Sequence, residues 1–215
     1  MRISDLSRRS GVPIATIKFY LREHLLQPGE PTGRNQADYS DAHLRRLRLI
    51  KMFTAIGELD LTSVRRLMTA VADDRLPLID LFEVLNQVLV ASKDTTSESD
   101  QSLARASSDA DRIIESAGWQ IRPDAAARAH LTLVLSAMRS LGCDCDPAFF
   151  AGYQKVADEL VRHELDKFQP EQERRAEAVA RSVLMQEAFA AMHQLAHEHY
   201  LARGTLPVPN VLRDS

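Results

Sequence analysis

Apolar residues at helical spacing, interrupted by glycine and proline, divide the first third of the chain into short helices. Ser4 is a candidate cap for the first helix, which ends at Ser10-Gly11, because glycine readily takes the left-handed conformation that closes a helix. Pro13 stands where a second helix begins, since the first turn of a helix does not need its missing N–H. Two short helices joined this way predict a helix-turn-helix, whose second helix lies in the major groove of DNA.

The second helix has one packing face and one open face. Ile17 and Leu21 are four residues apart, so they share a face and are expected to pack on the first helix. The open face carries small, hydroxylated and cationic side chains, which suit phosphates and base edges. The candidate DNA contacts of this helix are Ala15, Thr16, Lys18, Phe19, Tyr20 and Arg22.

Residues 27–39 form a polar segment with two prolines and two glycines, too long for a plain turn between helices. We interpret it as a two-stranded wing, with Arg34 presented to the phosphate backbone and Tyr39 at the base of the wing. Ser40-Asp41 then caps a helix that runs to Ile56 and carries Arg45 as a further candidate DNA contact. A short helix opened by Thr62 or Ser63 follows.

The remaining chain shows helical periodicity without strand alternation. A helix from Pro77 to about Ala91 precedes a polar run without apolar periodicity, which predicts a linker. From Leu103 onward, helices that start at proline and end at glycine predict an antiparallel bundle, with a last, alanine-rich helix from Pro170 to about Arg203 that suits a dimer interface. The predicted fold is therefore mainly α: a winged helix-turn-helix domain at 1–75, a connecting helix and linker at 76–102, an all-helical bundle at 103–205 and a tail at 206–215.

Charge is distributed unevenly between these parts. Residues 1–70 contain twelve basic and seven acidic residues, a net charge of +5, which leaves −8 for the rest of a chain whose total is −3. A basic N-terminal part attached to an acidic remainder is typical of a DNA-binding head on a body that does not bind DNA. There is no apolar run of the roughly 20 residues that span a bilayer. Because the first residues follow a helix pattern without a hydrophobic region, we expect no secretory leader. With two cysteines only, the expected location is the cytoplasm.

Several motifs in the same order resemble the DNA-binding domain of MerR-family transcription regulators over residues 2–71. The matching segments are Ile3-Ser4-Asp5-Leu6, Gly11-Val12, Thr16-Ile17-Lys18-Phe19-Tyr20, Leu25-Leu26-Gln27-Pro28, Tyr39-Ser40 and Leu44-Arg45-Arg46-Leu47-Arg48-Leu49-Ile50. The chain differs from the family pattern in two places: Lys18 replaces the usual arginine of the recognition helix, and the wing run Arg34-Asn35-Gln36-Ala37-Asp38-Tyr39 replaces Gly-Tyr-Arg followed by tyrosine. In this family one long coiled-coil helix normally follows the DNA-binding domain. Because a polar run follows Ala91 in this chain, we do not expect a continuous coiled coil here.

The resemblance implies a homodimer that binds a palindromic promoter element in double-stranded DNA, with RNA polymerase as a further partner. Activation through DNA distortion and repression by occupancy both stay open. The helical part resembles, in architecture only, the ligand-binding and dimerisation domains of TetR-type regulators. This resemblance implies a small-molecule effector, for which aromatic residues are the candidate pocket: Trp119, Phe150, Tyr153 and Phe189.

Two other functions compete with effector control. The helical part could bind a protein partner while DNA binding stays constitutive, or it could sense a metal or an oxidant. Cys143, Cys145, His193 and His197 are the candidate ligands for that sensor, because two histidines four residues apart share one helix face. We expect no enzyme activity and no cofactor, since the chain has no glycine-rich phosphate loop, serine elbow or HExxH motif.

Overall fold

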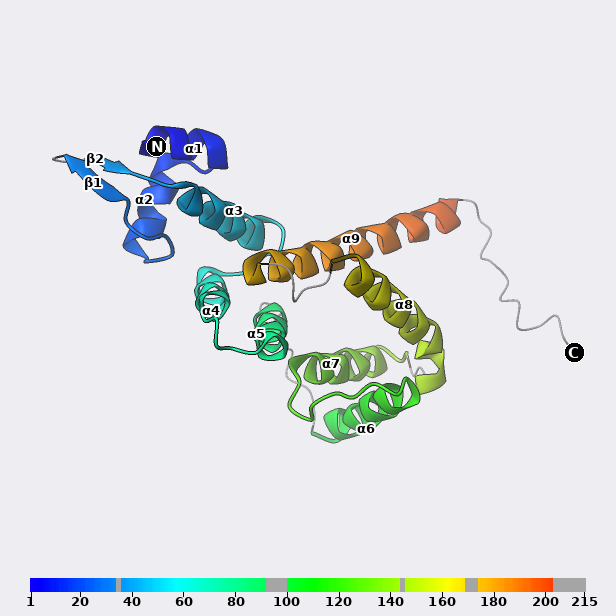
Figure 1. The fold of residues 1–215 in the computed structure, drawn as a ribbon. Coiled ribbons are helices and arrows are strands. Elements are labelled where there is room, and N and C mark those ends of the chain that lie inside the picture. The colour runs from blue at the N-terminus through cyan, green and yellow to red at the C-terminus, as the bar shows by residue number, and fades with distance from the viewer. Residues whose placement is uncertain (34–35, 92–99, 144–145, 169–173, 203–215) are drawn as a thin grey trace, which may run out of the picture.

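The structure is a computed structural model, and it describes residues 1–33, 36–91, 100–143, 146–168 and 174–202. The head comprises α1 (Ile3–Ser10), α2 (Ile14–Arg22), β1 (Glu30–Gly33), β2 (Gln36–Asp38), α3 (Asp41–Ala55) and α4 (Leu61–Ala72). The helical part comprises α5 (Leu78–Ala91), α6 (Asp100–Ser116), α7 (Ala126–Ser140), the 3-10 helix η1 (Pro147–Phe150), α8 (Ala151–Phe168) and α9 (Arg175–Ala202). The head forms one end of the molecule, and α9 runs away from it past the other helices (Figure 1). The predicted mainly helical fold with a winged helix-turn-helix is confirmed.

The turn between α1 and α2 forms as its residues predict. Gly11 has a φ of 65°, and its N–H donates to the carbonyl of Ser7, which closes α1. Pro13 directly precedes α2. One detail differs: α1 begins at Ile3 with Arg2 as its cap, so Ser4 lies inside the first turn and the predicted cap was wrong.

The cap of α4 also lies earlier than predicted. Oδ1 of Asp60 accepts a hydrogen bond of 2.9 Å from the backbone N–H of Ser63, so the helix begins at Leu61 and not at Thr62 or Ser63. This hydrogen bond satisfies one of the backbone donors that the first turn leaves unpaired.

The wing is an antiparallel pair of short strands. Glu30 lies opposite Asp38 and Gly33 opposite Gln36, with a shift of register between Pro31 and Gly33. The chain start holds the base of the wing, because the N–H of Tyr39 donates to the carbonyl of Met1 and the Met1 ammonium donates to the carbonyl of Tyr39, both at 2.8 Å. The start of the chain and the wing therefore form one unit.

The buried core of the head extends into the last helix. Phe53 of α3 and Leu67 of α4 belong to the same buried cluster as Leu81 of α5 and Val183 of α9. A Cβ at Gly57 would lie 3.1 Å from Cγ1 of Val183, which shows how closely α9 approaches the end of α3. Packing thus continues across residue 75, where the sequence suggested a boundary.

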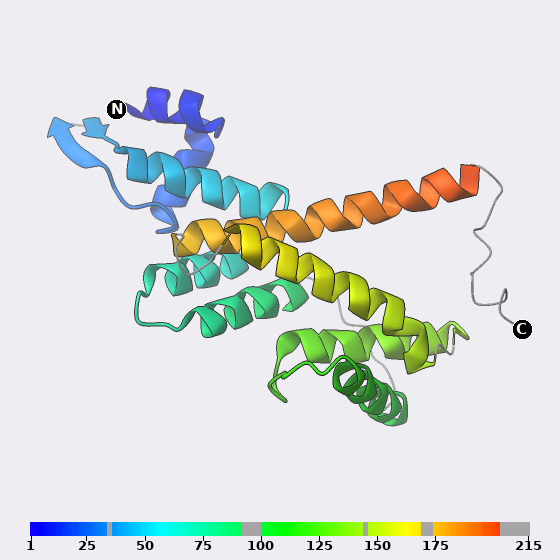
Figure 2. The same ribbon diagram turned by 45° about the vertical axis from the view of Figure 1, so that its right-hand side comes forward.

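The pair α6 and α7 has a smaller core of its own, formed by Ala106, Ala110, Ile113 and Leu135. Polar contacts join the same two helices: Arg128 donates two hydrogen bonds, of 2.7 and 2.8 Å, to the carboxylate of Asp111. In contrast, α8 has no buried residue, and α8 and α9 diverge from a common end near the head (Figure 2). None of the helices in the described part of the chain combines the length and apolarity of a bilayer crossing.

Candidate nucleic-acid interface

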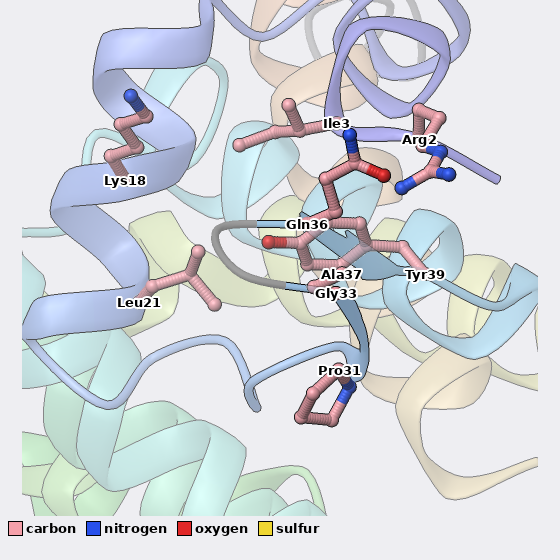
Figure 3. A pocket seen from close by; sticks show the side chains of 9 residues that line it. All are labelled: Arg2, Ile3, Lys18, Leu21, Pro31, Gly33, Gln36, Ala37 and Tyr39. Atoms are coloured by element: carbon pink, nitrogen blue, oxygen red, sulfur yellow. The ribbon is translucent and has the colours of Figure 1, made fainter.

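A hollow of about 680 Å³ separates α2 from the wing. Its lining residues come from the chain start, the recognition helix and both strands of the wing: Arg2, Ile3, Lys18, Leu21, Pro31, Gly33, Gln36, Ala37 and Tyr39. Lys18 and Leu21 form one wall on α2, and the wing residues form the facing wall (Figure 3). A helix and a wing on either side of an open hollow can hold the backbone of a duplex while the helix enters the major groove.

Lys18 and Arg2 supply the positive charge of this hollow. Lys18 is exposed and, within the described residues, has no ion pair or side-chain hydrogen bond, so its ammonium group is available for DNA. Arg2 is held to the wing, because Nη1 donates to Oγ1 of Thr32 at 3.1 Å and Nε lies 3.8 Å from Oδ1 of Asp38. One cation is thus free and the other is fixed at the foot of the wing.

The predicted open face of α2 is exposed only in part, since Phe19 also packs against the core of the head. Ile17 is fully buried, whereas Ala15 and Arg22 are exposed and Thr16 and Phe19 are half-buried. The guanidinium carbon of Arg22 lies 5.9 Å from the centre of the Phe19 ring, a cation–π contact that orients Arg22 along the helix. Whether these side chains contact DNA stays a prediction.

Tyr20 and Tyr39 have a different environment from the other candidates. Each is only 8% exposed and belongs to the buried cluster of the head. The rings of Tyr39 and His43 are arranged edge to face with their centres 5.3 Å apart, and this contact joins the base of the wing to the start of α3. Their burial indicates a role in packing; Tyr39 also lines the hollow, and whether either side chain contacts DNA stays a prediction.

The two remaining candidates are Arg34 and Arg45. Arg34 lies outside the described residues. Arg45 is exposed on α3, but it lines a pocket of about 270 Å³ between α3 and α9, together with Arg48 and Arg174. Arg45 therefore borders the start of α9 as well as solvent.

Other cations of the head brace the helix-turn-helix. Arg48 and Lys51 of α3 donate to the carbonyls of Arg9 and Gly11, both at 3.3 Å, so α3 holds the end of α1 and the turn. Arg46 donates to the carbonyl of Leu25, and its burial lowers the pKa of this guanidinium. Part of the positive charge that marks the head in the sequence is therefore engaged in hydrogen bonds that support the fold.

Sequence reasoning missed Arg2 and Gln36 as members of this site. Both line the hollow opposite α2, and Gln36 is exposed on β2. A signal for Gln36 was present, since it lies within the predicted wing. Arg2 gave no comparable signal, because its place depends on the pairing of the chain start with Tyr39.

The aromatic residues proposed for an effector pocket do not form one group. The ring centres of Phe150, the last residue of η1, and Tyr153 of α8 lie 5.9 Å apart, and Phe150 packs against the core of α6 and α7. Phe189 lies on α9, 38% exposed, beside His193, and Trp119 is half-buried after α6. None of these four lines any of the three pockets described in this article.

The candidate metal ligands lie on different elements. The rings of His193 and His197 are 4.6 Å apart on α9, whereas Cys143 is exposed after α7. Cys145 lies outside the described residues. Among the residues that the structure describes, no group of three or more His, Cys, Asp or Glu side chains could hold a metal ion.

The recognition helix α2, the wing formed by β1 and β2, and the basic hollow between them define a winged helix-turn-helix protein that binds DNA. The family of MerR HTH regulatory proteins matches residues 1–71. The chain is also similar to the proposed transcriptional regulator SCO5550 from Streptomyces coelicolor A3(2), with a TM-score of 0.69, 33% identity, and coverage of 94% of this chain and 97% of that one. No curated protein matches the chain. The chain belongs to the MerR family of DNA-binding transcription regulators.

Proposed function

We propose that this regulator acts as a homodimer on a palindromic promoter element and that a small-molecule effector bound in its helical part controls it. The observation that supports the dimer is the second half of α9, which no other described element covers. Residues 183–202 contain no lysine or arginine and two carboxylates. Met192, Leu195 and Leu201 are 56%, 64% and 72% exposed there. A long helix that is apolar on several sides normally has protein around it.

The spacing along this half of α9 suits a second helix. One row of residues alternates steps of three and four: Met185, Ala188, Met192, Leu195, His199 and Ala202. This is the 3.5-residue repeat of a coiled-coil seam, and its two alanines let a partner helix come close. The occupant that fits is α9 of a second copy, because an identical seam is self-complementary about a two-fold axis.

An antiparallel pair of α9 helices gives a separation between heads that matches DNA. Each head is held near Val183, and the 20 residues from there to the end of α9 span about 30 Å at 1.5 Å per residue. Antiparallel pairing would place the two attachment points at opposite ends of that length. Half-sites one turn of DNA apart are separated by about 34–36 Å, so two heads could enter successive major grooves.

Leu195→Glu tests the dimer, since it places two carboxylates in the proposed seam. We expect this variant to sediment as a monomer and to bind a palindromic duplex, selected with the wild-type protein, at least about tenfold more weakly. Gln186→Glu is the matched control, because Gln186 is exposed on the same helix but faces away from the seam. A Leu195→Glu variant that still sediments with the wild-type mass of a dimer would reject the α9 interface.

A further inference from the structure

A groove of about 510 Å³ lies where α5, α8 and α9 converge. Its walls include Ile79 and Phe82 of α5, Leu165 and Phe168 of α8, and Ala178 and Arg181 of α9. The volume falls within the range of about 300–1,000 Å³ that is usual for small-molecule sites. It also lies on the first half of α9, N-terminal to the seam proposed for the dimer.

Among the described residues, no side chain covers the apolar walls of this groove. Ile79 is 71% exposed, Leu165 51% and Phe168 36%, although all three are large apolar side chains. Covering such a surface with an apolar molecule is favourable in proportion to the area removed from water. The groove therefore fits an elongated apolar ligand.

Two arginines give this end of α9 a positive charge. The guanidinium carbon of Arg181 lies 4.1 Å from the centre of the Phe168 ring, on the groove wall. Arg175 is not among the lining residues but precedes Ala178 by one turn of α9, and within the described residues its Nε and Nη2 are buried without a hydrogen-bond partner. A buried donor group of a cation that lacks a partner is costly, and an anion bound beside it would remove that cost.

We propose that the groove binds an elongated apolar molecule with one carboxylate, held at the arginine end. Glu164 is the acidic side chain on the wall, and it would repel a carboxylate placed against α8. The inference rests on the proposed function, because it names the chemical class of the effector. It differs from the sequence-based pocket, since none of the four aromatic candidates lines this groove.

The position of the groove lets the head respond to a ligand. Leu78 and Phe82 line the groove and pack against the buried cluster of the head. On α9, Ala178 lines the groove, and the adjacent Val179 belongs to that same cluster. A ligand that spreads or clamps α5 and α9 would therefore act directly on helices that support α3 and α4.

Decanoate is a suitable probe, with 1-decanol as its uncharged counterpart, and both are titrated into the full-length protein by calorimetry. We expect decanoate to bind at least about tenfold more tightly than decanol, because a charge-assisted hydrogen bond contributes about 1.5–3 kcal/mol. Arg175→Met should raise the melting temperature without ligand, since it removes the unpaired buried donors, and should lower decanoate affinity to that of decanol. Ile79→Glu should abolish binding of both probes, whereas Leu141→Glu, at an exposed position that follows α7 and lies outside the groove, should not.

Three results would overturn the proposal. Equal affinity for decanoate and decanol would reject the carboxylate. Absence of decanoate binding, or unchanged binding by Ile79→Glu, would reject the groove. Binding of the unliganded protein to its selected palindrome is measured in parallel. If the protein binds decanoate but does not bind the palindromic duplex, the proposed function is rejected, whereas the proposal that the groove binds a carboxylate ligand still stands.

Discussion

Lys18→Ala is the most direct test of the proposed DNA interface. Lys18 is exposed on α2 and has no ion pair or side-chain hydrogen bond within the described residues, so its removal should not change the melting temperature. If its ammonium group contacts a base edge, the substitution should weaken binding to the selected operator by about 1–3 kcal/mol, or roughly 5- to 150-fold. If it contacts only a phosphate, the slope of log K against log salt should fall by about one for each head, equally on all sequences.

Fluorescence anisotropy with an operator duplex and a scrambled duplex separates these outcomes. Lys155→Ala, at an exposed lysine on α8, is the control for a general loss of charge. Lys18→Arg should preserve or increase operator affinity, because a guanidinium can bind guanine in a bidentate manner. Equal loss on both duplexes would reject base reading, and unchanged affinity on both would exclude Lys18 from the interface.

Three further substitutions test the supports of the head by urea unfolding. Gly11→Ala should destabilise by about 1–2 kcal/mol, since φ is 65° there and a Cβ would lie 3.0 Å from Nζ of Lys51. The hydrogen bond from the Ser63 backbone N–H lowers the pKa of the Asp60 carboxyl. This carboxylate therefore stabilises the fold above its ordinary pKa of about 3.9, and the stabilisation is lost as pH falls below it. Asp60→Asn keeps a capping oxygen that does not titrate, so its free energy of unfolding should fall less than that of the wild type as pH is lowered from above about 3.9 through the lowered pKa of Asp60. Phe53→Ala should lower the free energy of unfolding by about 3–5 kcal/mol, because Phe53 is fully buried. A decrease of less than about 1 kcal/mol would mean that the buried cluster shared by the head, α5 and α9 is not the main source of stability of the head.

The head could be predicted from the sequence because its signals are local. Gly11 and Pro13 mark the turn through their own backbone preferences, and the proline- and glycine-rich segment from 27 to 39 marks the wing. These features do not depend on which other parts of the chain lie nearby. The cap at Ser4 was missed by two residues, which is the usual uncertainty of a helix end.

The sequence predicted that the rest of the chain is helical, but it did not predict how these helices pack on one another and on the head. The periodicity of α9 cannot distinguish Val183, which is buried against the head, from Leu184, which is 36% exposed, since apolar residues occur on all sides of this helix. The same ambiguity affected the aromatic residues: Phe150 packs on α6 and α7, and Phe189 stands on α9. The groove between α5, α8 and α9 also depends on contacts between distant segments, which a single sequence does not contain.

The close approach of Val183 to Gly57 has a consequence for how the chain folds during synthesis. The helix-turn-helix leaves the ribosome first, but the core beneath it is complete only after Val183 has been added, more than a hundred residues later. At about 5–20 residues per second, this delay is on the order of 10 s. A truncated or unfinished chain would therefore lack a fully supported head. Stable binding to a promoter would then require that the helical part, which carries the proposed dimer seam and effector groove, has already been synthesised.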